Sequence, residues 1–298
     1  GKFTLELNVD RLRGDLVGTT STEMFHYFSE ELLNQPDYSC SFYNEYPVLI
    51  RAIVTYLYYW QEAFIEFLDR LITDWEDIKK EFFPNASFNS LTKVDMGVSD
   101  SHNRGRVVYI LQFDNSLKLV YKPKPLGVNK AFQDCLVWLN ELGLPYLHKT
   151  IRVLDRNEYG WEEFAEAKLC NNRDEISRFY WRQGSYLALL YVLNGSDFHY
   201  ENLIACGEFP VLIDLETLFH GAEYSQVEQE QKSKAVFKAW SLLSKSVFRV
   251  GLLPQLVFSA NGKVSLDLSG LGGEAGQVLP TEIPVAQKMY TDEMHFAY

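Results

Sequence analysis

The sequence has few cysteines and no paired cysteine motif. The four that are present stand far apart, at Cys40, Cys135, Cys170 and Cys206, without a Cys-x-x-Cys pair or a Cys and His at zinc-ligand spacing. This spacing excludes the usual patterns of a structural zinc site. It predicts reduced thiols in a cytoplasmic protein.

Long apolar runs and an excess of basic residues are also missing. No stretch approaches about 20 uninterrupted apolar residues, and the start "GKFTLELNVD" lacks the plan of a signal peptide. Forty acidic residues against 28 basic ones give a net charge of -12. We therefore expect no membrane insertion and no nucleic-acid partner. Because an initiator Met is missing too, we expect a piece of a longer protein.

Hydrophobic residues are plentiful, and in the first part of the chain they follow a helical period. Between Tyr46 and Phe83 they recur at steps of three and four residues. Thr73 and Glu76 have the spacing of a capping box, which would divide this helix in two. Residues 1–90 are therefore predicted to form a helical unit.

The pattern changes after residue 90. "RVVYILQF" and "LKLVYKP" flank the turn "DNS", and "IRVLD" and "YGWEEF" flank "RNE", so each pair predicts a β-hairpin. A helix that ends at a glycine, "KAFQDCLVWLNELG", lies between the hairpins, and residues 173–194 return to a helical pattern. The expected fold class is α+β. We expect a kinase-like small lobe over residues 91–170 and a kinase-like second lobe over residues 171–298, behind the N-terminal helical unit.

The stretch "SDFHYENLIACGEFPVLIDLET", residues 196–217, holds the strongest chemical signal. Phosphoryl transfer needs a base or orienting group and carboxylate or amide ligands for Mg²⁺. Asp197 and Asn202 have the Asp-x-x-x-x-Asn spacing of a kinase catalytic loop, and Asp214 follows the apolar run "VLI". His199 lies between the Asp and the Asn, where it can stabilise charge or share proton transfer. Asn202 and Asp214 are the predicted metal ligands.

A kinase site also needs a cation on the nucleotide phosphates. Lys122, at the end of the second predicted strand, is the candidate, with Lys124 as a weaker alternative. The helix over residues 130–142 should supply the acid that holds Lys122. Asp134 and Glu141 are the options, and the sequence does not choose between them.

The segment before the first hairpin arm occupies the place of a phosphate-covering loop. It reads "GVSDSHNRG", residues 97–105, which is not a Gly-x-Gly-x-x-Gly loop. A carboxylate aimed at ATP would repel it. Asp100 is therefore expected either to turn aside or to have a task beyond binding phosphate.

Five motifs in this order resemble the dehydratase domain of class II lanthipeptide synthetases (LanM-type). They are "SDSHNRG", "LVYKPKPL", "YGWEEF", "SDFHYENLIA" and "FPVLIDLETL". The resemblance implies a lipid-kinase-like core that uses ATP and Mg²⁺ to phosphorylate Ser and Thr of a ribosomal precursor peptide. The same site would then eliminate phosphate, giving dehydroalanine and dehydrobutyrine.

The resemblance also assigns residue roles. Lys122, Asn202 and Asp214 match the positions that bind ATP and the metal, and Asp197 and His199 match catalytic positions. Asp100 and His102 match the polar loop that serves elimination. An "FRPT"-like stretch of the family is missing, since neither Arg249 nor Thr281 stands in one. We therefore expect truncation, with that stretch and a C-terminal cyclase domain following in the full-length parent.

Two other functions fit the same motifs. One is a small-molecule or lipid kinase that does not eliminate phosphate. The other is a pseudokinase module that binds a leader peptide without turnover.

Overall fold

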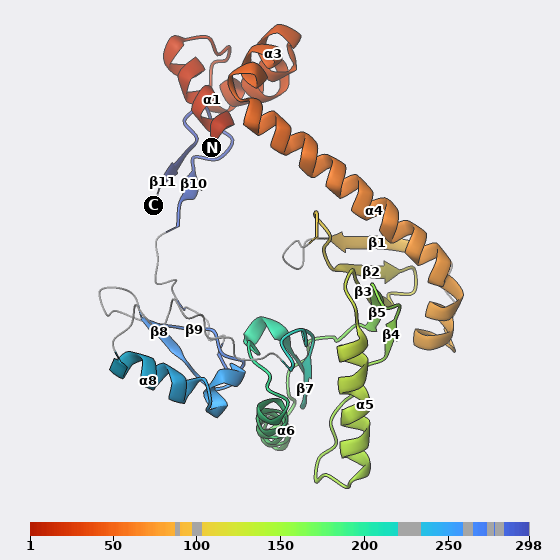
Figure 1. The fold of residues 1–298 in the computed structure, drawn as a ribbon. Coiled ribbons are helices and arrows are strands. Elements are labelled where there is room, and N and C mark those ends of the chain that lie inside the picture. The colour runs from red at the N-terminus through yellow and green to blue at the C-terminus, as the bar shows by residue number, and fades with distance from the viewer. Residues whose placement is uncertain are drawn as a thin grey trace. The chain divides into compact units, whose positions relative to one another are not determined.

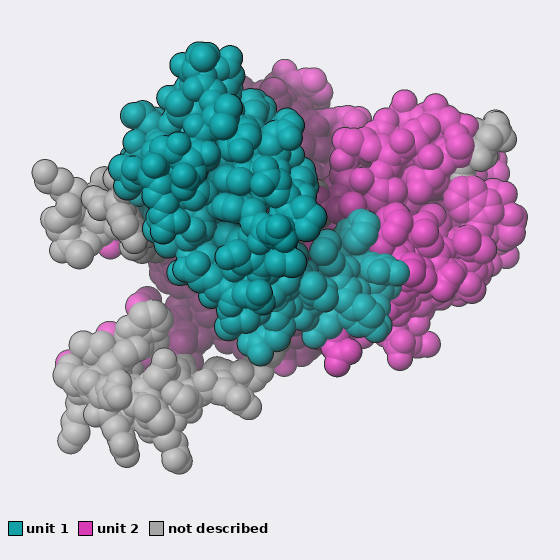
Figure 2. Space-filling model, turned by 90° about the horizontal axis from the view of Figure 1, so that it is seen from above, with its two compact units in different colours: residues 1–62, 279–298 teal, residues 63–278 magenta. Residues whose placement is uncertain are grey.

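The computed structural model describes residues 1–86, 90–96, 103–219, 234–258, 265–272, 277 and 283–297. The chain divides into two compact units, coloured separately in Figure 2. The first unit is Gly1–Glu62 with Leu279–Tyr298, and the second is Ala63–Val278. Each candidate site residue of the sequence falls within the second unit.

The first unit joins N-terminal helices to a small hairpin from the other end of the chain. Its elements are α1 (Lys2–Arg13), α2 (Ser21–His26), a π-helical turn (Tyr27–Glu31), a 3-10 turn (Leu32–Asn34), α3 (Pro36–Glu45), β10 (Val285–Gln287) and β11 (His295–Ala297). Leu7 and Phe28 lie in its core, against which Met294 packs. α2 begins with a capping box. The Thr20 side chain accepts a hydrogen bond from the backbone N–H of Glu23, and the Glu23 side chain accepts one from the backbone N–H of Thr20.

The long helix α4 (Pro47–Phe82) contributes to both units. Its buried residues keep a spacing of three and four: Ala63, Phe67, Leu71, Asp74, Ile78 and Phe82. The predicted break at Thr73 is wrong, since the helix continues through it. The buried face is continuous there because Asp74 accepts hydrogen bonds from Trp161 Nε1 at 2.8 Å and Arg156 Nε at 2.9 Å.

A five-stranded antiparallel sheet lies against α4 in the second unit (Figure 1). Its strands are β1 (Leu91–Met96), β2 (Tyr109–Phe113), β3 (Lys118–Lys122), β4 (Val153–Asp155) and β5 (Gly160–Glu163), in the spatial order β1-β2-β3-β5-β4. Both predicted hairpins are confirmed, as β2–β3 and β4–β5. Leu111, Tyr121 and Trp161 face the helix and are almost fully buried. Their neighbours along each strand point to the opposite face.

The other described elements of the second unit are α5 (Gly127–Glu141), α6 (Arg173–Val192), a 3-10 turn (Tyr200–Asn202), β6 (Leu203–Cys206), β7 (Phe209–Leu212), α8 (Lys234–Leu243), a second 3-10 turn (Val247–Val250), β8 (Leu256–Phe258) and β9 (Ser265–Asp267). Several of them surround a separate core. Phe132 of α5, Tyr186 and Leu190 of α6 and Leu212 of β7 meet in this core together with Phe198. The core therefore reaches directly under residues 196–202.

These elements confirm a mixed α and β chain with the predicted helices over α5 and α6. The finer expectation of a two-lobed kinase-like fold stays a prediction, as does the three-part division at residues 90 and 170. All four cysteines are free. Among the helices of the described ranges, none combines the length and apolar content that crossing a bilayer requires.

Candidate functional site

Lys122 lies at the end of β3 and is held by a buried acid. The residue is 5% exposed, and its Nζ lies 2.5 Å from Oε2 of Glu162, a residue that is 2% exposed. The acid comes from β5 and not from the following helix, so the expectation of Asp134 or Glu141 is wrong. Asp134 instead pairs with Lys130 on the surface of α5.

The register of the sheet explains why Glu162 reaches Lys122. Val120 pairs with Glu162 and Lys122 with Gly160, so Lys122 and Glu162 are diagonal neighbours on one face. The second carboxylate oxygen of Glu162 accepts a hydrogen bond from Asn129 Nδ2 of α5 at 2.5 Å. Both oxygens of the buried acid are therefore satisfied, which fixes the position of the lysine. The sequence "YGWEEF" places Trp161 and Glu162 on opposite sides of a strand, but it does not show that this strand pairs with β3.

Lys122 also links the sheet to the β6–β7 hairpin. Its ammonium donates a hydrogen bond to the carbonyl oxygen of Ile213 at 2.5 Å. The N–H of Ile213 in turn donates to the carbonyl oxygen of Asn202 at 3.0 Å. The backbone of Ile213 is therefore the point at which Lys122, Asn202 and the adjacent Asp214 come together. The structure brings together these three predicted residues.

Asp214 stands directly after this point and carries a basic partner. Lys124 Nζ lies 2.9 Å from Asp214 Oδ1 and 2.8 Å from Glu216 Oε2. Burial alone lowers the pKa of Lys124, but its hydrogen bonds to Glu216 and Asp214 outweigh burial and raise the pKa above its ordinary value. Lys124 thus pairs with the carboxylates of Asp214 and Glu216, whereas Lys122 is the buried lysine, paired with Glu162. Glu216 is a site residue that the sequence reading missed, although it stands two residues after Asp214.

Asp197, His199 and Asn202 lie on one short loop. Asn202 Nδ2 donates to the carbonyl oxygen of Asp197 at 2.9 Å and lies 3.2 Å from His199 Nε2. The same His199 nitrogen is 3.9 Å from Asp197 Oδ1, and Nδ1 accepts from the N–H of Glu201 at 3.3 Å. The loop therefore gathers an acid, an imidazole and an amide within one small volume.

The loop is anchored by its aromatic residue. Phe198 is fully buried in the core formed with α6 and β7, whereas the side chain of Asp197 is 66% exposed. Asp197 also has a positive φ of 63°, in the left-handed region that non-glycine residues seldom adopt. The buried Phe198 and this turn direct the Asp197 carboxylate away from the core and toward solvent.

The donor atoms present suit a hard divalent cation. Because the Asn202 nitrogen is used within the loop, its amide oxygen is the atom that remains to face a cation, and Asp214 offers a carboxylate. Mg²⁺ prefers such oxygen ligands and commonly takes one or two from protein, with water and phosphate completing its shell. The described part of the chain contains no group of three His, Cys, Asp or Glu at metal-binding distance.

Two predicted residues, Asp100 and His102, lie outside the described residues. Their roles stay predictions. The described strands on either side are β1, which ends at Met96, and β2, which begins at Tyr109.

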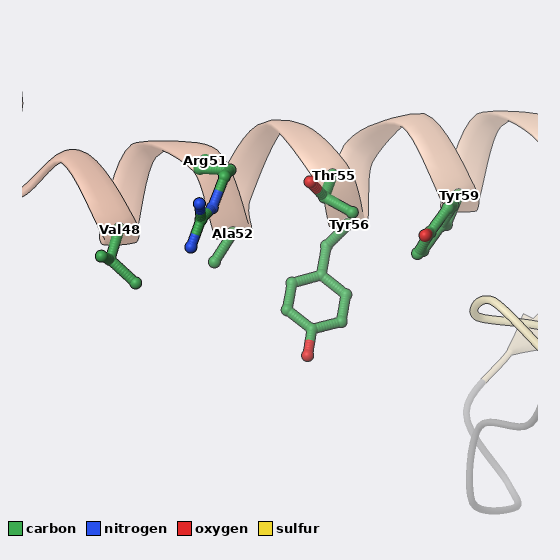
Figure 3. A pocket seen from close by; sticks show the side chains of 6 residues that line it. All are labelled: Val48, Arg51, Ala52, Thr55, Tyr56 and Tyr59. Carbon is green, nitrogen blue, oxygen red and sulfur yellow. The ribbon is translucent and has the colours of Figure 1, made fainter.

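Two surface hollows have linings that include none of Lys122, Asp197, His199, Asn202 and Asp214. One, of about 270 Å³, is lined by a single helix, α4 (Figure 3), through Val48, Arg51, Ala52, Thr55, Tyr56 and Tyr59. The other, of about 280 Å³, is lined by Glu66, Arg70, Asn103, Arg106, Pro123 and Glu158. Glu66 pairs with both arginines of the second hollow. Neither hollow contains the acids, amide or lysine described above.

Comparison with known proteins places the chain in a family. A family model described as a domain of unknown function, DUF4135, matches residues 46–298. The lacticin 481/lactococcin biosynthesis protein LcnDR2 of Lactococcus lactis subsp. lactis is 26% identical to the chain over 267 residues. Those residues are 85% of this chain and 28% of the relative, so the chain spans well under a third of the relative's length. Because the family model covers most of the sequence, the chain belongs to the DUF4135 family.

Proposed function

We propose that the chain is the phosphoryl-transfer part of a lanthipeptide synthetase dehydratase. Its substrate is a ribosomal precursor peptide, whose Ser and Thr side chains receive phosphate from ATP. The observation that carries the proposal is the meeting of Lys122, Asn202 and Asp214 at the backbone of Ile213. The similarity to a lacticin 481/lactococcin biosynthesis protein supports the choice of a peptide substrate.

Each group has a role that its chemistry allows. Lys122, oriented by Glu162, places a positive charge against the ATP phosphates. Asp197 accepts the proton of the attacking hydroxyl or orients that hydroxyl, and His199 beside it stabilises the charge that develops. Asn202 and Asp214 would hold Mg²⁺, which when bound neutralises charge on the phosphates. The loop anchored by Phe198 holds these side chains in position before substrate binds.

Elimination is the second half of the proposed reaction. A base removes the α-proton of the phosphorylated residue, the electron pair forms the Cα=Cβ bond, and the Cβ–O bond breaks as phosphate leaves with its electrons. Asp100 and His102 are proposed for this step on the family resemblance. A cyclase would act on the alkene product elsewhere in the full-length protein.

The test is a mass measurement on the peptide. The full-length protein is incubated with a lanthipeptide precursor peptide, ATP and Mg²⁺, and the peptide is analysed for added phosphate and for loss of water. We expect dehydrated peptide from the wild type and unmodified peptide from Asp197→Asn. Phosphopeptide as the sole end product would contradict the elimination step and support a kinase that only adds phosphate. An unmodified peptide with the wild type, despite nucleotide binding, would support a non-catalytic binding module instead.

A further inference from the structure

The loop that carries Asp197 and His199 is bonded through its backbone to two later segments. The N–H of Phe198 donates to the carbonyl oxygen of Val250 at 2.9 Å, and the N–H of Tyr200 donates to that of Leu268 at 3.1 Å. His199 and Ser269 form an isolated antiparallel bridge. Phe198 and Tyr200 of the loop therefore bond to two different later segments of the chain. Backbone hydrogen bonds therefore hold the loop on both sides, in addition to the burial of the Phe198 side chain.

The two later segments also hold each other. We call residues 250–252 and 268–271 the bracing segments. The N–H of Gly270 donates to the carbonyl oxygen of Gly251 at 2.9 Å, and that of Leu271 donates to Leu252 at 3.2 Å. The bracing segments and the loop therefore form one continuous hydrogen-bonded group. Displacing either segment would displace the loop.

Two glycines make this close approach possible. Gly251 has a φ of 86°, and a Cβ there would lie 2.9 Å from the backbone nitrogen of Phe198. A Cβ on Gly270 would lie 2.8 Å from the Phe198 carbonyl oxygen and 2.6 Å from Leu252 Cδ2. Distances below about 3 Å are repulsive for carbon against nitrogen or oxygen, so the backbone would have to move. Both glycines thus press against the same residue, Phe198, which stands between Asp197 and His199.

We propose that Gly251 and Gly270 are positioning residues for the reacting groups, acting through the backbone of Phe198. The inference rests on the proposed function, because it assumes that Asp197 and His199 act on the substrate. The Asp197 carboxylate makes a long contact with His199 Nε2, at 3.9 Å. Asp197 has a φ of 63° and adjoins Phe198, so the course of the loop backbone sets the direction of its side chain. Because Phe198 is fully buried, it cannot move aside without disturbing the core.

The chain provides a matched control for each glycine. Gly143 has a φ of 85°, close to that of Gly251, but a Cβ there would meet nothing within 4 Å. Gly184 lies in α6 and its Cβ would also meet nothing within 4 Å. Gly143→Ala therefore reproduces the backbone strain of Gly251→Ala without the contact with Phe198. Gly184→Ala reproduces the added methyl group of Gly270→Ala without the clash.

The experiment compares the four alanine variants of the full-length protein in peptide phosphorylation and ATP affinity. We expect Gly251→Ala and Gly270→Ala to lower kcat by about 100-fold, the effect of a displacement near 1 Å at a reacting group. The Kd for ATP should stay within about twofold of wild type, since the contacts of Lys122 with Glu162 and Ile213 are untouched. The two controls should keep the wild-type kcat. Wild-type kcat in Gly251→Ala and Gly270→Ala, or a loss that follows ATP affinity, would overturn the inference.

Hydrogen–deuterium exchange gives a readout that needs no turnover. The amides of Phe198 and Tyr200 should exchange at least about 10-fold faster in Gly251→Ala and Gly270→Ala than in the controls, because their bonds to Val250 and Leu268 are strained. Unchanged exchange would overturn the inference even if the wild type proved unable to phosphorylate the peptide. That last result would refute the proposed function separately.

One further variant covers the case in which Gly270→Ala does not fold. Adding Leu252→Val removes the Cδ2 atom that the new methyl group would meet, but leaves the contact with the Phe198 carbonyl oxygen. We expect the double variant to fold and to keep the lowered kcat. Full recovery of kcat would assign the defect to core packing and so contradict a role in positioning Asp197 and His199.

Discussion

The sheet side and the loop side of the site are held by different kinds of contact. On the sheet side, Lys122, Glu162 and Asn129 are all buried and are bonded to one another through side chains. On the loop side, Asp197 is mostly exposed and depends on backbone hydrogen bonds made by its neighbours. One consequence is that substitution of the functional side chain should destabilise the protein at Lys122 on the sheet side but not at Asp197 on the loop side.

The largest combined loss of activity and stability is expected for Lys122→Met. Loss of the ammonium removes the charge on the ATP phosphates and should lower kcat/KM by about 1000-fold, roughly 4 kcal/mol. It also leaves Glu162 buried without its ion-pair partner, which should lower the free energy of unfolding by about 3 kcal/mol. Steady-state kinetics and urea unfolding measure the two effects.

Asp197→Asn is the comparison for Lys122→Met on the loop side. It should abolish phosphorylation while changing the free energy of unfolding by less than about 0.5 kcal/mol, because the side chain is exposed. Equal destabilisation by the two substitutions would contradict the division into a buried sheet side and an exposed loop side.

A smaller effect is expected for Glu162→Gln, which keeps the shape of the side chain and removes its charge. The amide can still contact Asn129, but it no longer attracts Lys122, so kcat/KM should fall by about 10- to 100-fold with most of the change in ATP binding. Asp134→Asn and Glu141→Gln are the controls, since both acids lie on α5 and neither contacts Lys122. Near-wild-type kinetics in Glu162→Gln, or a loss in either control, would show that Glu162 does not orient the lysine.

The sequence predicted the elements whose signals are local. The turns at "DNS" and "RNE" and the glycine after α5 fix their hairpins and helix end through a few neighbouring residues. The predicted helix break at Thr73 was wrong because a capping box is a local signal. The helix continues there because Asp74 is buried beneath Arg156 and Trp161, and this tertiary contact does not show in the local sequence. Local patterns therefore gave most elements and one false boundary.

The arrangement of the site depended on contacts that the sequence does not display. The spacing of Asp197, Asn202 and Asp214 was readable because all three stand on one continuous segment around the β6–β7 hairpin. The choice of Glu162 was not, since it requires β5 to pair with β3 out of chain order. The bracing segments were equally hidden, because backbone hydrogen bonds between distant segments leave no side-chain pattern beyond isolated glycines.

The smallest effect is a pH dependence on the loop side. His148 is buried against Tyr186, which shares a core with Phe198, and its Nε2 lies 2.8 Å from Ser185 Oγ. Burial, with a contribution from Arg182, lowers the pKa of His148 to about 4. Its Nδ1 is buried and meets no hydrogen-bond partner among the described residues, which also disfavours the protonated ring.

The sign of the effect follows from the lowered pKa. Well above pH 6.5 the histidine is neutral in both the folded and the unfolded protein, so it adds no pH dependence to the free energy of unfolding there. Between pH 6.5 and about 4 the unfolded protein binds the proton first. Stability should therefore fall as the pH falls, by about 1.4 kcal/mol at pH 5.5.

His148→Gln keeps a polar group near Ser185 but cannot titrate, so it should lose less stability over the same interval. Urea unfolding at pH 7.5 and pH 5.5 measures the difference between wild type and variant, in which the titration of all other groups cancels. Equal losses of stability in the two proteins would show that acid destabilises the fold through groups other than His148. The prediction that protonation of His148 weakens the core beneath Phe198 would then be wrong.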